Sequence, residues 1–393
     1  MARQPGVPSL LRAMNDRSAL ELLLDQGPLT RATLGKLTGL SKVTASQLLG
    51  RLQERGLVEV VGARSAGRGP SAELYAVVPD CAHAVGVDVG PDRVGAAVAD
   101  VTGRVVAQAD LEAADDVAAL DVVRAAVSAV VERAGISTVR VSQLVIGTPG
   151  LVDPVTGDVD FSWDLPRWHA GLHDTLRRDL GCGVTIENDV NLAVVAERAE
   201  GAARGVDDVL LLWVSRGVGL AVVLGGRLHR GATGAAGEIG YLPVPGVPLP
   251  SSVERPFKGA FQRLVGAEAV LELAVEHGFP DPGARSAARA VTWALDAGPS
   301  AAPFLDELAR RLALGVAGAC AVVDPALVVL AGDVGSSGGE RLCALVSSAV
   351  GHIAPVHPHV VATAVSEAPV LRGALLTAVD HAREALFAST GDT

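Results

Sequence analysis

Aromatic residues and long apolar runs are scarce in this sequence. Six Phe, four Trp and two Tyr make up 3% of its 393 residues, although 49% of the residues are hydrophobic. A large core must therefore be built mainly from Ala, Val and Leu. No apolar run reaches the ~18 residues that span a bilayer, and residues 1–20 lack a signal-peptide core. We expect a soluble cytoplasmic protein of two or three domains, with no membrane partner.

Cysteine is scarce too, which limits disulfides and metal sites. The four cysteines stand singly, with no Cys-x-x-Cys pair, and this spacing fits reduced thiols better than a disulfide framework or a zinc knuckle. His352, His357 and His359 lie close together in sequence, but their spacing fits no common metal-binding pattern. We interpret them as surface or packing residues, and we predict no metal site and no cofactor.

Acidic residues exceed basic ones over the whole chain, which has a net charge of −11, but the excess is uneven. Residues 1–80 hold ten Lys and Arg against seven Asp and Glu, a balance of +3, whereas residues 81–393 hold 23 against 37, a balance of −14. Only the N-terminal part has a charge suited to the phosphates of nucleic acid.

The start of the chain carries the signals of a short helical motif. Residues 16–25 have closely spaced apolar side chains and predict a helix that ends at Gly27-Pro28. Thr30 is a candidate N-cap for a second helix over residues 31–38, and Gly39 allows the tight turn that follows.

A third helix completes that motif. Ser41 is the candidate N-cap, and residues 42–56 predict the helix, whose inward-facing side chains are expected to be Val43, Leu48, Leu49 and Leu52. The order of helix, short helix, glycine turn and helix is the spacing of a helix-turn-helix.

Two short strands, over residues 57–62 and 73–78, flank a basic loop that contains glycine, which is typical of a wing. In a winged helix-turn-helix the second helix of the motif enters the major groove, and the wing reaches the backbone or the minor groove. We predict as DNA contacts Thr30, Ser41, Lys42, Thr44, Ser46, Gln47 and Arg51, with Arg64 and Arg68 on the wing. The alternative is a small docking module with a solvated basic face; motif, wing and charge together favour DNA.

The rest of the chain alternates between strands and helices. Residues 84–111 read as a three-stranded meander, followed by a helix over 116–135, a buried strand over 141–153 and a strand and helix over 184–201. Residues 207–244 then repeat the strand, glycine turn and strand design. The pattern implies two similar halves.

These segments resemble the landmarks of the ROK family of sugar kinases and sugar-responsive repressors, over nearly the whole chain. In order, the landmarks are VGVDVG, VIGTPGLVDPVTG, IENDVNLAVVAERAEG, VSRGVGLAVVLGGRLHRGATGAAGEIGYLPV and DPALVVLAGDV. ROK repressors join this domain to a winged helix-turn-helix whose wing often contains a GR-type sequence, as residues 65–80 do. The resemblance implies an α/β protein: a winged helix-turn-helix at residues 1–80, and a duplicated actin/hexokinase-like (ribonuclease H-like) domain of two lobes at residues 81–393.

The first phosphate-binding turn of the family kinases is altered here. They have a D-x-G-G-T-like turn, whose counterpart is Asp88-Val89-Gly90-Pro91-Asp92. Pro91 removes an N–H donor, and Asp92 adds a negative charge where phosphate would lie. Both changes oppose ATP binding.

The other two nucleotide-side turns keep some features of the family kinases and lack others. Arg216 replaces a small polar residue in the second turn, although Gly217 and Gly219 remain, and Asp333 follows the glycine of the adenosine-side turn. For each turn the glycines are equally explained by folding alone. We therefore predict that the chain is not an enzyme, with sugar kinase activity as the alternative.

The sugar side of the family site is better matched. In the family an Asn-Asp pair binds sugar hydroxyls, its Asp is also the base of the kinases, and the Glu of an A-G-E element reaches the same sugar. Asn188, Asp189 and Glu238 match these positions. Carboxylates accept from vicinal hydroxyls, and an amide both donates and accepts. The alternative for Asp189 is an ordinary N-cap of the following helix.

Further sugar contacts follow from the same resemblance: Thr148, Gly150, Tyr241 and Glu254. Many family members place a His and then a zinc-binding cysteine cluster after the G-E-I-G element. Here Tyr241 occupies the His position and the following segment has no cysteine but five prolines, so we expect a loop without metal.

Together these features predict a DNA-binding transcriptional regulator, a repressor, controlled by a sugar or sugar derivative in a kinase-like cleft. Its expected partners are a double-stranded DNA operator and a small sugar effector, and its expected state is a homodimer or homotetramer. The alternatives are a ROK sugar kinase that also binds DNA, and a regulator whose effector domain has lost its ligand.

Overall fold

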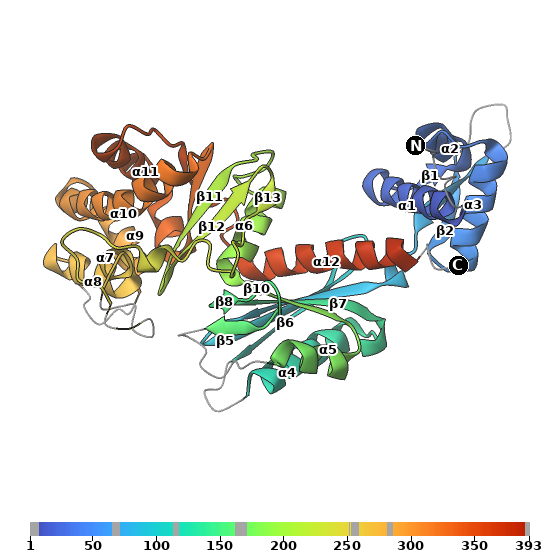
Figure 1. Ribbon diagram of the computed structural model, residues 1–393, viewed down its shortest axis with the longest axis horizontal. Helices are drawn as coiled ribbons and strands as arrows, with labels where there is room; N and C mark the ends of the chain where they lie inside the picture. Colours follow the sequence, from blue (N-terminus) through green and yellow to red (C-terminus); the bar gives the residue numbers. More distant parts are fainter. Residues whose placement is uncertain are drawn as a thin grey trace, which may run out of the picture.

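The computed structural model describes residues 8–64, 71–112, 118–161, 171–250, 252, 259–280 and 286–389, and shows a small N-terminal head joined to two larger lobes (Figure 1). No helix within these ranges is long and apolar enough to cross a membrane. The four cysteines are free thiols.

The head is a winged helix. Its helices are α1 (Pro8–Gln26), α2 (Arg31–Thr38) and α3 (Lys42–Glu54), and its sheet has the order β1-β3-β2, from β1 (Leu29–Thr30), β2 (Val58–Arg64) and β3 (Ala72–Val77). The predicted caps are confirmed: the Thr30 side chain accepts from the N–H of Thr33, and Ser41 accepts from that of Thr44. Gly39 has the left-handed φ of 72° that ends α2.

One expectation for α3 was wrong. Val43 does not face the core but is 67% exposed, whereas Ala45, Leu48, Leu49 and Leu52 are buried. These four positions follow the spacing i, i+3, i+4 and i+7 of one helix face, and position 43 lies outside it.

The first lobe is built on a five-stranded sheet of order β10-β7-β4-β5-β6. The three antiparallel strands are β4 (His83–Val89), β5 (Arg93–Asp100) and β6 (Val105–Glu112), and β7 (Val141–Thr148) and β10 (Gly183–Asn188) run parallel to β4. A small hairpin, β8 (Leu151–Val152) and β9 (Val159–Phe161), follows β7. Helices α4 (Ala119–Ala134) and α5 (Leu172–Leu180) cover one face of the sheet.

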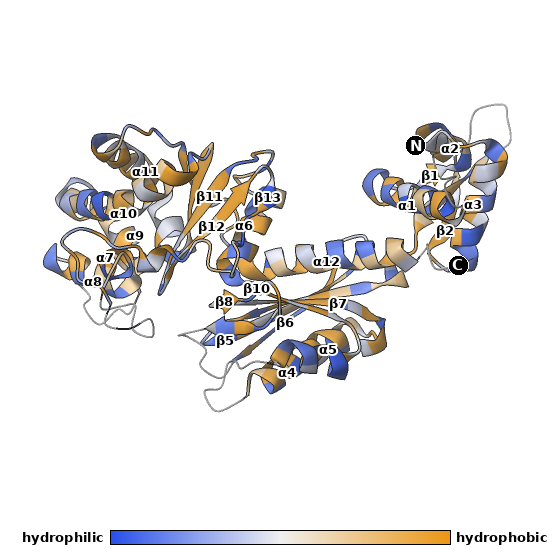
Figure 2. Ribbon diagram, viewed as in Figure 1, coloured by the Kyte–Doolittle hydropathy of each residue, from blue (hydrophilic) through white to orange (hydrophobic). Residues whose placement is uncertain are grey.

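The second lobe repeats this design. Its sheet has the equivalent order β15-β14-β11-β12-β13, from β11 (Val209–Val214), β12 (Val218–Leu224), β13 (Arg227–Leu228), β14 (Leu327–Ala331) and β15 (Val360–Ala362). The helices packed on its outer face include α8 (Ala267–Glu276), α9 (Ala287–Ala297), α10 (Ala302–Val323) and α11 (Gly332–Ile353), with the short α7 (Gln262–Val265) beside them. The strands of both sheets are strongly hydrophobic in Figure 2. The predicted duplication is confirmed.

The last helix of each half crosses to the sheet of the other half. Helix α6 (Asp189–Glu200) follows the first sheet but packs on the second, and α12 (Pro369–Ser389) follows the second sheet but packs on the first. The two helices also cross each other closely, since a Cβ at Gly373 would collide with the carbonyl oxygen of Leu192. The crossing places the start of α6 between the lobes.

The far end of α6 is fixed by a buried carboxylate. One oxygen of Glu197, a residue only 1% exposed, accepts from the N–H groups of Ala364 and Val365 at 2.9 and 2.8 Å and from the hydroxyl of Thr363, and the other accepts from the N–H of Ala202 at 2.7 Å. This carboxylate ties α6 to the segment that leads from β15 into α12.

Helix α12 continues past the first lobe into the head (Figure 1). Leu386 and Phe387 are part of the head's core cluster. The Arg17 guanidinium lies 5.0 Å from the centre of the Phe387 ring and is paired with Glu384 at 2.6 Å. The head is therefore attached to the same helix that forms one wall of the first lobe.

Candidate functional site

A cavity of about 340 Å³ lies between the two lobes, a size typical of small-molecule sites. Its walls come from the β4–β5 turn, the start of α6, the β11–β12 turn and residues 238–241. Among the described residues that line it, five carboxyl groups accompany one guanidinium, that of Arg216; the carboxyl groups are Asp88, Asp92, Asp189, Glu238 and Asp333.

The start of α6 supplies the Asn-Asp pair to this cleft. Asn188 is the N-cap: its Oδ1 accepts from the N–H groups of Val190 and Asn191 at 2.9 and 3.2 Å, and its Nδ2 donates to the carbonyl of Gly150 at 3.1 Å. The alternative interpretation of Asp189 as the cap was therefore wrong by one residue. Asp189 is the first helical residue, and its carboxylate accepts from the N–H of Val190 at 2.8 Å.

The carboxyl groups in the cleft perturb one another. Burial, and then the charge of Asp189, raise the pKa of Asp88 to about 7. The same two causes, in the same order, raise the pKa of Glu238 to about 7. Burial and Glu238 raise the pKa of Tyr241 to about 12. Near neutral pH the two perturbed carboxyls are thus poised between the neutral and ionised forms, which lets them both donate and accept hydrogen bonds.

Of the remaining predicted sugar contacts, some line the cleft and others do not. Gly150 and Tyr241 line the cleft. Thr148 is fully buried at the end of β7, its hydroxyl lies 3.4 Å from the carbonyl of Pro149, and it is not among the lining residues. The structure therefore does not place Thr148 among the lining residues of the cleft. Glu254 lies outside the described residues.

The first nucleotide-side turn uses its own hydrogen-bonding groups. The N–H of Gly90 donates to the carbonyl of Arg93 at 3.0 Å, and Pro91 has no N–H. The turn is a β-hairpin in which the Gly90 N–H is used internally.

The second turn is closed in the same way. The N–H of Ser215 donates to the carbonyl of Gly217 at 3.0 Å, and that of Val218 donates to Oε1 of the buried Gln262 at 2.9 Å. Gln262 also donates to the carbonyl of Arg216 at 3.0 Å. The Ser215 hydroxyl donates to Asp333 at 2.6 Å.

Packing explains why two positions in the nucleotide-side turns are glycine. A Cβ at Gly219 would lie 2.9 Å from a methyl group of Val190. Gly332 has a φ of 76°, and its Cβ would lie 2.6 Å from the carbonyl oxygen of Val214. Both positions therefore require glycine for folding, whether or not a ligand binds.

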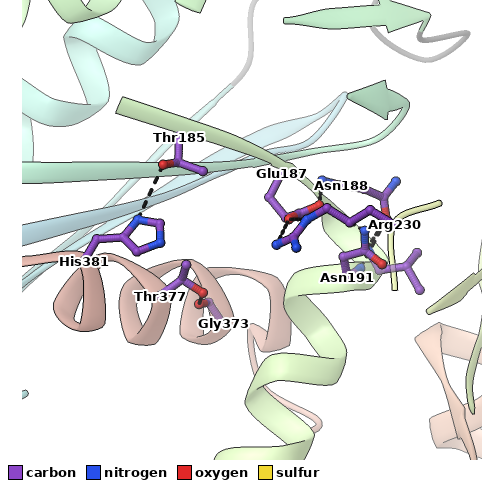
Figure 3. Close-up of polar contacts among 9 residues, drawn as sticks. Thr185, Glu187, Asn188, Asn191, Arg230, Gly373, Thr377 and His381 are labelled. Carbon is purple, nitrogen blue, oxygen red and sulfur yellow. Dashed lines mark hydrogen bonds and ion pairs between the residues drawn. The ribbon is translucent and has the colours of Figure 1, made fainter. Parts of the chain in front are cut away.

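Sequence reasoning missed an ion pair behind Asn188. Glu187, at the end of β10, is buried; its carboxylate accepts from Asn191 Nδ2 at 2.9 Å and from the N–H of Asn188 at 3.0 Å (Figure 3). Arg230 of the second lobe donates to the other carboxylate oxygen at 2.6 Å. The pair joins the lobes next to the cleft. A carboxylate in an apolar strand was the signal for Glu187, but its partner is distant in sequence.

Helix α12 passes close to the same strand. Thr185 of β10 lies 3.4 Å from Nδ1 of His381 on α12 (Figure 3). The Thr377 hydroxyl donates to the carbonyl of Gly373 at 2.8 Å, within the helix. The strand that ends at Asn188 is therefore in contact with the helix that enters the head.

On the head, the predicted DNA contacts lie in different environments. Ser41, Lys42, Ser46 and Gln47 of the α3 region and Arg64 of the wing are exposed. Thr44 is partly buried, and its hydroxyl is hydrogen-bonded to that of Ser41 at 2.9 Å. Arg31 of α2, which sequence reasoning did not select, donates to the Ser46 hydroxyl at 3.3 Å. The exposed set therefore gathers at the start of α3.

Two other predicted DNA contacts interact with residues within the head itself. Thr30 is only 8% exposed and its hydroxyl is hydrogen-bonded to Thr33 as well as capping α2. Arg51 is paired at 2.6 Å with Asp16, which is buried, and so joins α3 to α1. These contacts favour structural roles for both residues. Arg68 lies outside the described residues.

No group of three or more His, Cys, Asp or Glu within the described ranges is arranged to hold a metal ion. His352, His357 and His359 are exposed. The Nδ1 of His352 lies 2.6 Å from the carbonyl of Ser348, one turn earlier in α11.

Comparison with known families fits this architecture. Residues 84–380 match the model of the ROK family. The chain belongs to the ROK family. Residues 15–69, within the head, match the model of the MarR family. The ROK fold and the N-terminal winged helix expected from sequence are both confirmed.

Several ROK relatives are named regulators. The xylose repressor of Bacillus subtilis is 24% identical over 238 residues, which cover 60% of this chain and 62% of that repressor. The chain thus spans about three fifths of that relative's length. The DNA-binding transcriptional dual regulator NagC of Escherichia coli is 24% identical over 343 residues, 84% of this chain and 83% of NagC.

Solved ROK structures include both regulators and kinases. A ROK family transcriptional regulator, homologous to the Escherichia coli MLC protein, aligns with a TM-score of 0.75 at 19% identity, over 97% of this chain and 99% of that one. A ROK hexokinase from Thermus thermophilus aligns with a TM-score of 0.62 at 28% identity, over 77% of this chain and 99% of that one. The fold alone therefore does not separate the two activities.

Proposed function

We propose that this ROK protein is a DNA-binding transcriptional regulator, a repressor, whose affinity for its operator is controlled by a sugar bound between the two lobes. The observation that carries the proposal is the path of α12, which forms a wall of the first lobe and ends in the core of the head. The relatives named xylose repressor and N-acetylglucosamine repressor support it. Such a regulator would act in the cytoplasm.

DNA recognition is assigned to the start of α3. Lys42, Ser46 and Gln47 are exposed there and provide a charge for phosphate and donors and acceptors for base edges. Val43 is exposed among them, at 67%, and offers an apolar contact of the kind that reads a thymine methyl. Arg31 and the wing residue Arg64 would contact the backbone.

Sugar recognition is assigned to Asn188, Asp189 and Glu238, with Gly150 and Tyr241 beside them. Because Asn188 Oδ1 is occupied by the helix cap, its contribution to a sugar is the second N–H of Nδ2. Gly150 belongs to the first lobe and Glu238 to the second, with Asp189 between them at the start of α6, so one sugar that contacts all three would favour a closed cleft. The proposed response starts with this closure.

Helix α12 is the proposed link from cleft to head. A change in the angle between the lobes acts on α6, which crosses α12 at Gly373 and is tied to the entry of α12 by Glu197. The other end of α12 holds the head through Phe387, and Arg55 of the head donates to the carbonyl of Ser389 at 2.9 Å. Rotation of α12 would therefore reorient α3.

We further propose that the protein lacks kinase activity. Phosphoryl transfer needs backbone N–H groups and metal charge around the phosphates. In this chain the N–H groups of Gly90 and Ser215 are used within the turns, that of Val218 donates to the Gln262 side chain, and Asp92 and Asp333 add negative charge. The alternative, a DNA-binding sugar kinase, would use Asp189 as its base.

A dimer or tetramer is part of the proposal, because one reader helix covers only a few base pairs and paired half-sites are the usual route to useful affinity. By linkage, DNA must change sugar affinity by the same factor as sugar changes DNA affinity.

Two measurements test the proposal on the full chain. Thermal unfolding with a panel of pentoses, hexoses and amino sugars should give a rise in melting temperature for a specific sugar, lost in Asp189→Ala. Selection from a random DNA duplex pool should enrich a paired site whose binding is weakened by Gln47→Ala and changed by the same sugar. ATP-dependent sugar phosphorylation that requires Asp189 would instead favour the kinase, and a folded chain that responds to no sugar would favour a vestigial site.

A further inference from the structure

The charge around the cleft limits what it can hold. At neutral pH a sugar phosphate carries one to two negative charges, whereas free sugars and N-acetylated amino sugars are neutral and sugars with a free amino group can be cations. The described lining residues offer five carboxyl groups and one guanidinium. Even with Asp88 and Glu238 half protonated, carboxylates outnumber the guanidinium.

The carboxyl groups surround the cleft rather than occupy one side. Asp88 and Asp92 belong to the β4–β5 hairpin, Asp189 to the start of α6, Glu238 to the second lobe, and Asp333 to the start of α11. A phosphate in the cavity would therefore face carboxyl groups on several of its walls. Coulomb energies of about 1 kcal/mol per pair at 4 Å in water, and more in a partly buried site, make each such contact unfavourable.

Several groups that would offset this repulsion are already engaged. The N–H groups of Gly90 and Ser215 are hydrogen-bonded within their own turns, and that of Val218 donates to the side chain of Gln262. The N-terminus of α6, the end of a helix that favours anions, is occupied by the Asn188 amide and the Asp189 carboxylate. The Arg230 guanidinium lies behind the cleft, paired with Glu187.

We infer that the effector of this cleft is an unphosphorylated sugar, neutral or cationic, and that phosphate esters of the same sugar are rejected. The inference rests on the proposed function and specifies the ligand class for the same site. It also assigns Asp92 and Asp333, which are exposed at the nucleotide side, as the groups that exclude phosphate.

The test compares matched pairs by calorimetry on the full chain: glucose with glucose 6-phosphate, N-acetylglucosamine with its 6-phosphate, and glucosamine with its 6-phosphate. The sugar that binds is expected to do so at least tenfold more tightly than its ester. Asp92→Asn and Asp333→Asn should each narrow that ratio. Asp306→Asn, a matched substitution of an exposed carboxylate on α10 outside the cleft, should leave the ratio unchanged.

The outcomes separate the inference from the proposed function. An ester that binds as tightly as its free sugar, or more tightly, overturns the inference and leaves sugar control intact. The inference is also overturned if Asp306→Asn reduces the ratio of sugar affinity to ester affinity as much as Asp92→Asn does. The effect would then come from the net charge of the protein. Absence of binding by any sugar in a folded chain overturns both.

Discussion

Helices α6 and α12 hold equivalent positions in the two halves of the duplicated domain, yet their ends have different roles. Helix α6 begins in the cleft, where Asn188 and Asp189 crowd its first turn with polar groups. Helix α12 begins at Pro369, with no acidic residue in its first turn, and ends at Ser389, with Phe387 in the core of the head. In the duplicated domain, one of these helices thus contributes an end to the cleft and the other contributes an end to the head.

The largest effect should come from the point where the two helices are tied. Glu197→Ala removes four hydrogen bonds and leaves the N–H groups of residues 364 and 365, the second of them buried, without acceptors, so the unfolding free energy should fall by roughly 4 kcal/mol. Glu200→Ala is the control, because Glu200 is exposed and its pair with Arg372 at 3.3 Å should contribute less than about 1 kcal/mol. Urea unfolding of both variants measures the difference, and equal losses would show that Glu197 does not join the helices.

The head end of α12 is tested by Phe387→Ala. Removing a buried ring should cost about 3 kcal/mol, a value typical of large-to-small core changes, while sugar binding at the distant cleft should persist. In a DNA-binding assay the sugar response should disappear. Phe387→Leu keeps most of the apolar contact and should restore part of that response; a variant that loses the ring and keeps a full response would contradict the role of α12.

The carboxyl groups around the start of α6 should make the unfolding free energy depend on pH. The pKa values of Asp88 and Glu238 are raised to about 7 in the folded state, above their ordinary values of 3.8 and 4.5. Between about pH 4 and pH 7 the folded chain therefore holds more protons, and its unfolding free energy falls as pH rises. Asp189→Asn removes one cause of both shifts and should reduce this fall by on the order of 2 kcal/mol. Unfolding curves from pH 5 to pH 8 measure it, with Asp306→Asn expected to follow the wild type.

The smallest effect concerns the exposed surface at the start of α3, in the head. Val43→Ala changes an exposed side chain, so stability should change by less than about 0.5 kcal/mol. Affinity for a selected operator should fall by about 1 kcal/mol, roughly fivefold, through the loss of an apolar base contact. Fluorescence anisotropy gives the affinity, and an unchanged value would remove Val43 from the interface.

Local signals in the sequence predicted the parts that local physics decides. Thr30, Gly39 and Ser41 were placed correctly because a cap or a left-handed turn depends on a few adjacent residues. Val43 was wrongly predicted to face the core because the apolar residues of this short helix are compatible with two alternative buried faces. Adjacent Asn188 and Asp189 are equally good caps by type, and only the backbone angles assign the role to Asn188.

Contacts between distant segments were not predictable in this way. Glu187 and Arg230 are 43 residues apart, and neither has a motif that points to the other. The resemblance to ROK proteins supplied the candidate cleft residues, but it also included Thr148, which is fully buried at the end of β7 and is not among the lining residues. The path of α12 followed from no local pattern, since its two ends are buried by segments more than 170 residues earlier in the chain.

The crossing of α12 also sets the order in which the chain can fold as it is synthesised. The head's helices and wing are made first, whereas the first lobe's sheet is complete at residue 188 but lacks one of its two covers until residues 369–389 emerge. One face of that sheet, lined by Ala84, Ala97 and Val145, would remain exposed to solvent through the synthesis of the entire second lobe. On the ribosome, the lobe that begins earlier is therefore the one that finishes last.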